Sequence, residues 1–394
     1  MYNIFRKILN RLNERIFVPI SVLFKKRHYS SNVHYRANND IGKCFEDRID
    51  LSGDDTVLLR RITSAYQKAS HDLLAYPELF RPSNEWLPIY KYYLKEVMQA
   101  LKECNISDLE KIYRNFWREP CSMGLMGLSS NMKSSFFEKN NKISYFNKTF
   151  YLNDSIHRFN LWMKLMGQRY SVDSLISPLI GNPYGYFIDN KFIKAGADYQ
   201  HYYATRINDL LDSKQTRKVI AEIGGGYGGM AYYLIRDAEK TTYIDFDLPE
   251  NLALTSYYLM KAFPKKKVLL YGEAEFEGVN LAEYDIILMP NFQLDRLPNG
   301  TCDLIFNSYS LAEMSPQTIN HYVLQSASLL KEGGWFFHVN HTKRSLVSAR
   351  DFPIPDNFVL ISEEIAAWNL GRDSNMDEYE FLYQKNRHLN DRHG

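Results

Sequence analysis

The stretch AEIGGGYGGMAYY at residues 221–233 constrains the fold more than any other part of this sequence. It places five glycines within residues 224–229, after an apolar run typical of a strand and before an aromatic-rich run typical of a helix. Ordering a glycine costs more conformational entropy than ordering other residues, so such a cluster indicates a close approach to the backbone. A strand, a glycine turn and a helix in this order predict the first crossover unit of a parallel sheet.

The sequence from Lys218 onward alternates between strand-like and helix-like segments, which predicts a Rossmann-like α/β domain with a mostly parallel sheet. Two apolar runs, KVLLYG and YDIILMP, compete for the third strand position, and the spacing before CDLIF favours the second. The closing runs FVLISEEIAAW and EYEFLYQK alternate in polarity and predict an antiparallel hairpin at the sheet edge.

Three regions are expected along the chain. They are a basic amphipathic segment over 1–38, a mainly helical domain over 39–215 that caps the substrate, and the α/β domain over 216–394. The stretch SPLIGNPYGYFIDNKFI is punctuated by Pro and Gly, and we expect an irregular loop that serves as a lid or pocket wall.

Two acids end the second predicted strand in TTYIDFD, about twenty residues after the glycine turn, where this architecture holds the ribose of an adenosine cofactor. Asp247 is the first choice for this role and Asp245 the second, while capping of the next helix is the structural alternative for Asp247. The glycines satisfy both the dinucleotide pattern GxGxxG and the pattern ExGxGxG of S-adenosylmethionine sites. Glu222 would repel a pyrophosphate but attract an ammonium group, so it favours S-adenosylmethionine.

At this point the sequence resembles a known family. Residues 218–385 are similar to class I S-adenosylmethionine-dependent methyltransferases, with EIGGGYGG as the first motif and DFDLP at the ribose-binding strand end. Together, GNPYG, EIGGGYGG, DLP and NSYSLAEM resemble the sugar O-methyltransferases of bacterial polysaccharide gene clusters. The resemblance implies a seven-stranded sheet with a C-terminal antiparallel hairpin, S-adenosyl-L-methionine as cofactor, and a hydroxyl of a sugar or glycan precursor as acceptor.

The cofactor-binding residues expected on these grounds lie in the glycine turn, at the second strand end and on the preceding helix. They are Glu222, Gly224, Gly225, Gly226, Tyr227, Gly228, Asp245, Asp247 and Arg206. Packing is the alternative for Tyr227, and an ordinary helix face is the alternative for Arg206.

Methyl transfer to a sugar hydroxyl requires alignment and a general base. Glu313, directly after the fourth strand, and His341, at the end of the fifth, are the candidate catalytic residues. The alternative for Glu313 is an acid in the first turn of the next helix, and His338 is a weaker candidate within the fifth strand. No ligand cluster with diagnostic spacing stands out in the sequence, so we assign no metal ligands, and the need for a divalent ion that would polarise paired hydroxyls stays open.

The net charge, the cysteines and the distribution of basic residues indicate which partners and which cell compartment to expect. A formal net charge of +2 offers no general field for nucleic acid, so we expect none as a partner. The four cysteines form no CxxC pair and indicate reduced thiols in a cytoplasmic protein. Residues 1–36 carry eight Lys or Arg against one Glu, which suits contact with anionic lipid, a docked helix or an organellar presequence. The oligomeric state is not predicted.

Three other functions remain open at this stage. The acceptor could be a phenolic or lipid hydroxyl, because the many aromatic residues before the glycine turn suit either. The chain could be an NAD-dependent oxidoreductase or a cofactor-binding module without catalysis.

Overall fold

The structure is a computed structural model that describes residues 40–84, 86–125, 145–211, 216–343, 346–367 and 377–386. The predicted basic segment over 1–38 lies outside these residues. The chain forms two compact units: Met1–Ser52 with Arg114–Tyr202, and Gly53–Tyr113 with Tyr203–Gly394. The region 39–215, expected as one helical domain, is thus divided between both units, because residues 53–113 pack with the sheet.

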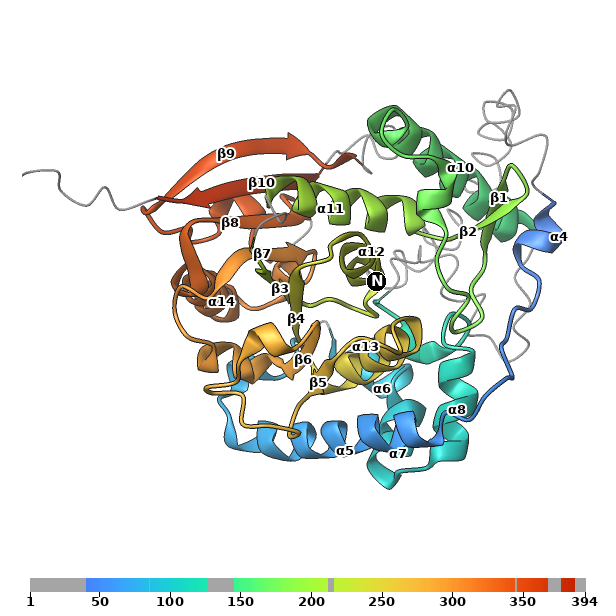
Figure 1. The fold of residues 1–394 in the computed structure, drawn as a ribbon, viewed down its shortest axis with the longest axis horizontal. Helices are drawn as coiled ribbons and strands as arrows, with labels where there is room; N and C mark the ends of the chain where they lie inside the picture. The colour runs from blue at the N-terminus through green and yellow to red at the C-terminus, as the bar shows by residue number, and fades with distance from the viewer. Residues whose placement is uncertain are drawn as a thin grey trace, which may run out of the picture. The chain divides into compact units, whose positions relative to one another are not determined.

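The second unit, here called the sheet unit, contains an eight-stranded sheet in the order β5-β6-β4-β3-β7-β8-β10-β9 (Figure 1). The strands are β3 (Lys218–Ile223), β4 (Thr241–Asp247), β5 (Val268–Leu270), β6 (Ile286–Pro290), β7 (Cys302–Ser308), β8 (Leu330–His341), β9 (Phe358–Ile365) and β10 (Glu378–Lys385). The strands from β5 to β8 pair in parallel, and β10 pairs antiparallel with both β8 and β9. The predicted Rossmann-like class and its C-terminal hairpin are therefore confirmed.

The sheet has one strand more than predicted. YDIILMP forms β6 beside β4, as the spacing favoured, and KVLLYG adds β5 at the edge beyond it. Both competing runs are therefore strands. KVLLYG pairs with the outer side of YDIILMP, so the two runs do not compete for the place beside β4.

Helices of the sheet unit connect and cover these strands. They are α5 (Thr56–Asp72), α6 (Leu87–Tyr92), α7 (Lys95–Glu103), α8 (Ile106–Arg114), α11 (Ala197–Leu210), α12 (Gly229–Asp237), α13 (Pro249–Ala262) and α14 (Pro316–Leu329), with short 3-10 turns η2 (Leu73–Ala75), η3 (Glu78–Phe80), η6 (Leu281–Glu283), η7 (Asn291–Arg296), η8 (Leu311–Glu313) and η9 (Ala349–Asp351). The limit between the units falls within α11. The helix α5 is tied to α13, since Asp55 accepts hydrogen bonds from Tyr257 and Lys261.

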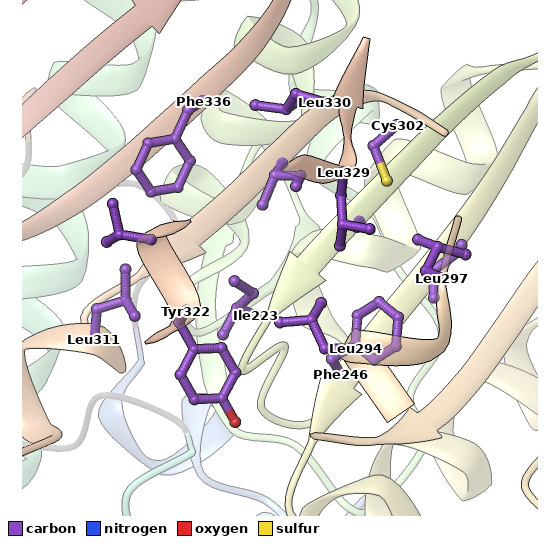
Figure 2. Packing of buried hydrophobic residues seen from close by; sticks show 14 of the residues in the cluster. Ile223, Phe246, Leu294, Leu297, Cys302, Leu311, Tyr322, Leu329, Leu330 and Phe336 are labelled. Atoms are coloured by element: carbon purple, nitrogen blue, oxygen red, sulfur yellow. The ribbon is translucent and has the colours of Figure 1, made fainter. Parts of the chain in front are cut away.

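The two faces of the sheet differ in character, because side chains alternate along each strand. Ile223, Phe246 and Phe336 point to one face and join the main apolar core with residues of α14 and η7 such as Tyr322 and Leu294 (Figure 2). The alternate residues of β3 and β4 point to the other face and include acids. The same alternation that builds the core therefore places the acids together on the opposite face.

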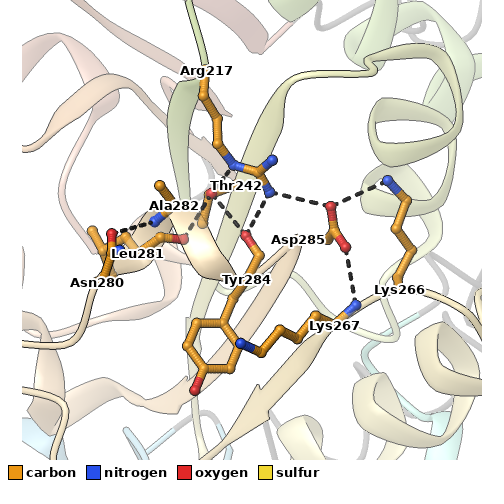
Figure 3. Close-up of polar contacts among 9 residues, drawn as sticks. All are labelled: Arg217, Thr242, Lys266, Lys267, Asn280, Leu281, Ala282, Tyr284 and Asp285. Carbon is orange, nitrogen blue, oxygen red and sulfur yellow. Dashed lines mark hydrogen bonds and ion pairs between the residues drawn. The ribbon is translucent and has the colours of Figure 1, made fainter.

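The amino-terminal ends of β4 and β6 are tied by a polar network (Figure 3). Arg217 donates to Thr242 Oγ1 at 2.9 Å and to the Tyr284 carbonyl at 2.7 Å. Asp285 accepts from Arg217 at 3.2 Å, from Lys266 at 3.2 Å and from the backbone of Lys267 at 3.0 Å. These bonds hold the strands in register at the end of the sheet away from the glycine turn.

The other unit is described by itself. It contains α4 (Ile41–Cys44), η4 (Pro120–Ser122), α10 (Tyr145–Met166), η5 (Val172–Leu175) and a two-stranded antiparallel sheet of β1 (Gly185–Ile188) and β2 (Lys191–Lys194). The predicted irregular loop is thus partly a hairpin. Asp189 and Asn190 form its turn with φ of 48° and 63°, left-handed values that Asp and Asn tolerate better than most residues.

Two smaller predictions can be compared with the structure. All four cysteines are outside disulfides. Across the described ranges, no helix combines the length and the apolar character needed to cross a lipid bilayer.

Candidate functional site

The glycine turn (residues 224–229) joins β3 to α12 at the carboxyl end of the parallel strands, the edge at which such sheets bind ligands. Gly224, Gly226 and Gly228 have φ of 78°, 64° and 83°, a left-handed conformation that other residues rarely adopt. A Cβ atom on Gly225 would lie 2.8 Å from the carboxylate of Asp245. Part of the close approach predicted at these glycines therefore comes from the protein's own acid.

The backbone N–H groups of the turn are used within the chain. Gly225 donates to Asp245 Oδ1 at 3.0 Å, and Gly226 donates to Asp247 Oδ2 at 3.3 Å. Gly224 donates to the Phe246 carbonyl, and Gly228 donates to the Gly225 carbonyl. A turn that binds a pyrophosphate presents such N–H groups to the ligand, whereas these four are occupied by acceptors of the chain.

Four carboxylates surround the turn. Glu222 pairs with Asp245 across β3 and β4, Asp247 follows two residues later on the same face, and Glu250 lies in the first turn of α13. All except Glu250 are less than 9% exposed. Within the described part of the chain, no Lys or Arg forms an ion pair with any of the four.

Burial raises the pKa of these acids because it disfavours the charged form. The pKa of Glu222 rises to about 7, although Tyr243 donates a 2.6 Å hydrogen bond to its Oε2. The pKa of Asp247 rises to about 6, and burial together with the neighbouring acids Asp247 and Glu222 raises that of Asp245. This arrangement favours a ligand that brings positive charge or hydrogen-bond donors.

The two candidate ribose acids differ in how they are used. Asp247 Oδ1 accepts from the Leu248 backbone at 2.6 Å and from Asn251 at 2.9 Å, so this carboxylate holds the start of α13. The helix begins at Pro249 as expected, but its N-cap residue is Leu248. Asp245 Oδ2 is buried and has no hydrogen-bond partner among the described residues. Both acids lie at the predicted position, and Asp245 has an acceptor atom that no described residue uses.

Tyr227 and Arg206 have other contacts. The Tyr227 ring is 1% exposed and packs edge-on against Tyr258, with ring centroids 5.2 Å apart, which supports the packing alternative. Arg206 on α11 lies 3.7 Å from Glu380 Oε2 on β10, and β10 is three strands away from β3. These contacts lend no support to the prediction that Arg206 binds the cofactor.

Glu313 lies in η8, immediately beyond β7, and its Oε2 accepts a 2.8 Å hydrogen bond from the indole N–H of Trp86. The alternative of a helix-dipole acid is wrong, because α14 begins only at Pro316 and Ser315 caps it through the Thr318 backbone. The half-buried Glu313 therefore lies before the first turn of α14 and is held by the side chain of Trp86.

A buried amide network fixes the loop that carries Glu313. Asn307 donates to the Ile223 carbonyl and to Ser310 Oγ, and Asn340 donates to Asn307 Oδ1. Asn340 Oδ1 in turn accepts from the Ala312 backbone at 3.2 Å. The Asn307 bonds connect the start of η8 to β3, and the Ala312–Asn340 bond connects η8 to β8, so η8 is anchored to both strands.

His341 ends β8 and lies beside the first residues of β10. Its Nδ1 is 3.6 Å from Asp377 Oδ2, and it is paired in register with Glu378. Potential ligand atoms of these three residues lie within 4.8 Å of one another, so they could hold a metal ion. Sequence reasoning missed Asp377 and Glu378, because they lie 36 and 37 positions after His341 and only strand pairing joins them. His338 is fully buried among aromatic rings, and burial lowers its pKa to about 3, so it serves packing.

A second group that sequence reasoning missed is the cap segment, defined as residues 73–84 and 86–94. It contacts the carboxyl ends of three strands: Phe80 O accepts from Asn291 after β6, Trp86 donates to Glu313 after β7, and Tyr90 donates to Glu250 after β4. The stretch SPLIGNPYGYFIDNKFI, expected as a lid, belongs to the other unit. In the sequence, the aromatic residues of the cap segment look like those of any amphipathic helix. Nothing in this pattern indicated that the segment lies at the carboxyl ends of the strands.

Comparisons with known proteins give methyltransferase structures at low similarity. No sequence-family profile and no curated protein matches the chain. The pyocyanin biosynthetic protein PhzM is 11% identical, with 48% of this chain and 56% of PhzM covered and a TM-score of 0.34. The chain thus spans little more than half of PhzM.

Two further structures are similar to the same extent. The N-methyltransferase NodS from Bradyrhizobium japonicum, solved with S-adenosyl-L-homocysteine, is 11% identical over 48% of this chain and 88% of NodS, with a TM-score of 0.33. A candidate sarcosine dimethylglycine methyltransferase from Galdieria sulphuraria is 13% identical over 60% of this chain and 98% of that protein, with a TM-score of 0.36. The fold assignment rests on the strand order and not on these similarities.

Proposed function

We propose that this chain is an S-adenosylmethionine-dependent O-methyltransferase that acts on a hydroxyl of a sugar or glycan precursor, in the biosynthesis of a surface polysaccharide. The observation that carries the proposal is the chemistry of the glycine turn. Two of its N–H groups bind the chain's own carboxylates, and four acids surround it that form no ion pair with a Lys or Arg among the described residues. A cofactor with a sulfonium and an ammonium group suits this site, and a dinucleotide with a pyrophosphate does not.

Under this proposal the residues have distinct roles. Asp245 Oδ2 and Asp247 would accept hydrogen bonds from the ribose hydroxyls, and Glu222 would attract the ammonium group. When bound, the cofactor supplies a methyl group on a positively charged sulfur. The left-handed glycines of the β3–α12 turn carry no Cβ atom, so a ligand could lie directly against the backbone of the turn.

Glu313 is the proposed general base. It follows β7 directly and is oriented by Trp86, so its carboxylate would accept the proton of the acceptor hydroxyl as the oxygen attacks in line. The sugar acceptor rests on the resemblance of GNPYG, DLP and NSYSLAEM to sugar O-methyltransferases.

Calorimetry tests the cofactor. S-adenosylhomocysteine and NAD are titrated into the full chain, and we expect binding of the first and none of the second. Asp245→Asn removes the carboxylate with an available oxygen and should weaken binding at least about tenfold, the effect of one charge-assisted hydrogen bond. Glu239→Gln, at an exposed acid of the same unit, is the matched control and should bind normally. Binding of NAD without S-adenosylhomocysteine would refute the proposal.

Mass spectrometry tests the acceptor. Surface glycans from cells with and without the gene are compared, and the expected difference is the loss of one CH₂ mass per missing methyl group. A Glu313→Gln gene should reproduce the deletion if Glu313 is the base. Unchanged glycans in the deletion strain would remove the sugar acceptor from the proposal while leaving the cofactor result intact.

A further inference from the structure

The end of β8 and the start of β10 bring one imidazole and two carboxylates together. His341 and Glu378 are direct partners in the antiparallel ladder, and Asp377 is the residue before Glu378. One potential ligand atom from each residue lies within 4.8 Å of the other two. The His341 Nδ1 to Asp377 Oδ2 distance is 3.6 Å.

This separation between Nδ1 and Oδ2 is compatible with an ion that bridges the two side chains. A charge-assisted hydrogen bond between a nitrogen and a carboxylate has a length of about 2.7–2.9 Å. Two donors that each lie about 2.1 Å from one ion are 3.6 Å apart when the angle at the ion is roughly 115°. The three potential ligand atoms lie within 4.8 Å of one another, and two such bonds span at most about 4.2 Å, so side-chain adjustments of no more than roughly 0.6 Å would complete the set.

The three side chains are held in place by the surrounding structure. The Asp377 carbonyl accepts from the Thr342 backbone at 2.7 Å, which fixes the entry into β10. Tyr309 Oη donates to Glu378 Oε2 at 3.1 Å, and the Tyr309 ring lies 5.4 Å from that of His341. A preformed site of this kind loses little side-chain entropy when it binds an ion.

Burial and charge favour a cation here. The Asp377 side chain is 1% exposed, and a second carboxylate lies next to it. Two neighbouring carboxylates concentrate negative charge, which attracts a cation, and the low exposure of Asp377 reduces the screening of that attraction by water.

We propose that His341, Asp377 and Glu378 form a binding site for a divalent transition-metal ion. One imidazole nitrogen with two carboxylate oxygens suits Zn²⁺, Mn²⁺ or Fe²⁺ better than Ca²⁺, which takes six to eight oxygens. The site goes beyond the proposed function, because it requires neither the cofactor nor the acceptor. If Nδ1 of His341 binds a metal, Nε2 carries the proton and His341 is not the general base, which leaves that role to Glu313.

The test uses the full chain without an affinity tag, stripped of metal by a chelator. Mn²⁺ is titrated and the free ion is followed by electron paramagnetic resonance, and Zn²⁺ binding is measured by calorimetry. We expect one site per chain, and His341→Ala, Asp377→Asn and Glu378→Gln should each weaken it at least about tenfold. Far-ultraviolet circular dichroism of each variant verifies folding.

The chain offers a matched control. His321 Nε2 lies 3.0 Å from Asp295 Oδ1 on the surface of the same unit, at direct hydrogen-bond distance, and the described residues add no third ligand to this pair. His321→Ala should leave metal affinity unchanged. Absence of a site in the wild-type chain, or binding that survives Asp377→Asn, would overturn the proposal. Binding of S-adenosylhomocysteine, measured on the same variants, is expected to persist, so failure here is distinguishable from failure of the proposed function.

Discussion

Glu222→Gln gives a quantitative test of the acid cluster at the glycine turn. Glutamine has the shape of protonated glutamate and can still accept the hydrogen bond from Tyr243. The substitution therefore removes the titration of this position while keeping its packing. Its effect on stability should depend on pH in a way that the pKa of Glu222 determines.

The magnitude follows from the pKa, which burial raises from 4.5 to about 7. The folded chain binds the proton more tightly than the unfolded chain, so the contribution to stability is present below about pH 4.5 and is lost as pH rises through about 7. Each pKa unit corresponds to about 1.4 kcal/mol, so the loss by pH 8 amounts to about 3 kcal/mol. The variant should thus be about 3 kcal/mol more stable than wild type at pH 8 and within about 1 kcal/mol of it at pH 5.

Urea unfolding followed by tryptophan fluorescence at pH 5, 6, 7 and 8 measures this difference. Glu239→Gln makes the same change at an exposed glutamate and should show no pH-dependent difference from wild type. The reasoning is refuted if Glu222→Gln loses stability in parallel with wild type between pH 5 and 8. Such a result would mean that Glu222 stays ionised in the folded chain.

Three other outcomes are expected. Tyr90→Phe removes the 2.6 Å hydrogen bond to Glu250 and should lower the free energy of unfolding by about 1–3 kcal/mol in urea, whereas Tyr92→Phe, on the exposed side of the same helix, should not. Burial lowers the pKa of Lys194 to about 7, so wild-type stability should rise with pH from about 7 to 10, and Lys194→Met should flatten that rise in the same assay. Deletion of residues 1–36 should release the chain from vesicles of anionic lipid in a sedimentation assay, and retention would contradict a membrane role for this segment.

The parallel direction of the strands was predictable because the alternation of strands and helices can be recognised from local sequence patterns. The glycine turn, the acids of TTYIDFD and the closing hairpin each carry such a signal within about ten residues. The hairpin of β1 and β2 was missed, although Asp189 and Asn190 are turn formers, because the surrounding Pro and Gly suggested a loop. The strand β5 was not predicted as an additional strand, because its three residues are too few to show a recognisable hydrophobic pattern.

By itself, the sequence determined the fold class, the position of the glycine turn and the two acids at the end of the second strand, since these depend on local chemistry at short range. Only the tertiary structure decided which groups meet there: the turn's N–H groups bind Asp245 and Asp247, the cap segment reaches Glu313 through Trp86, and Asp377 joins His341. These contacts link residues 20 to 227 positions apart. Such pairings depend on strand order and packing of the whole sheet unit, which no local pattern records.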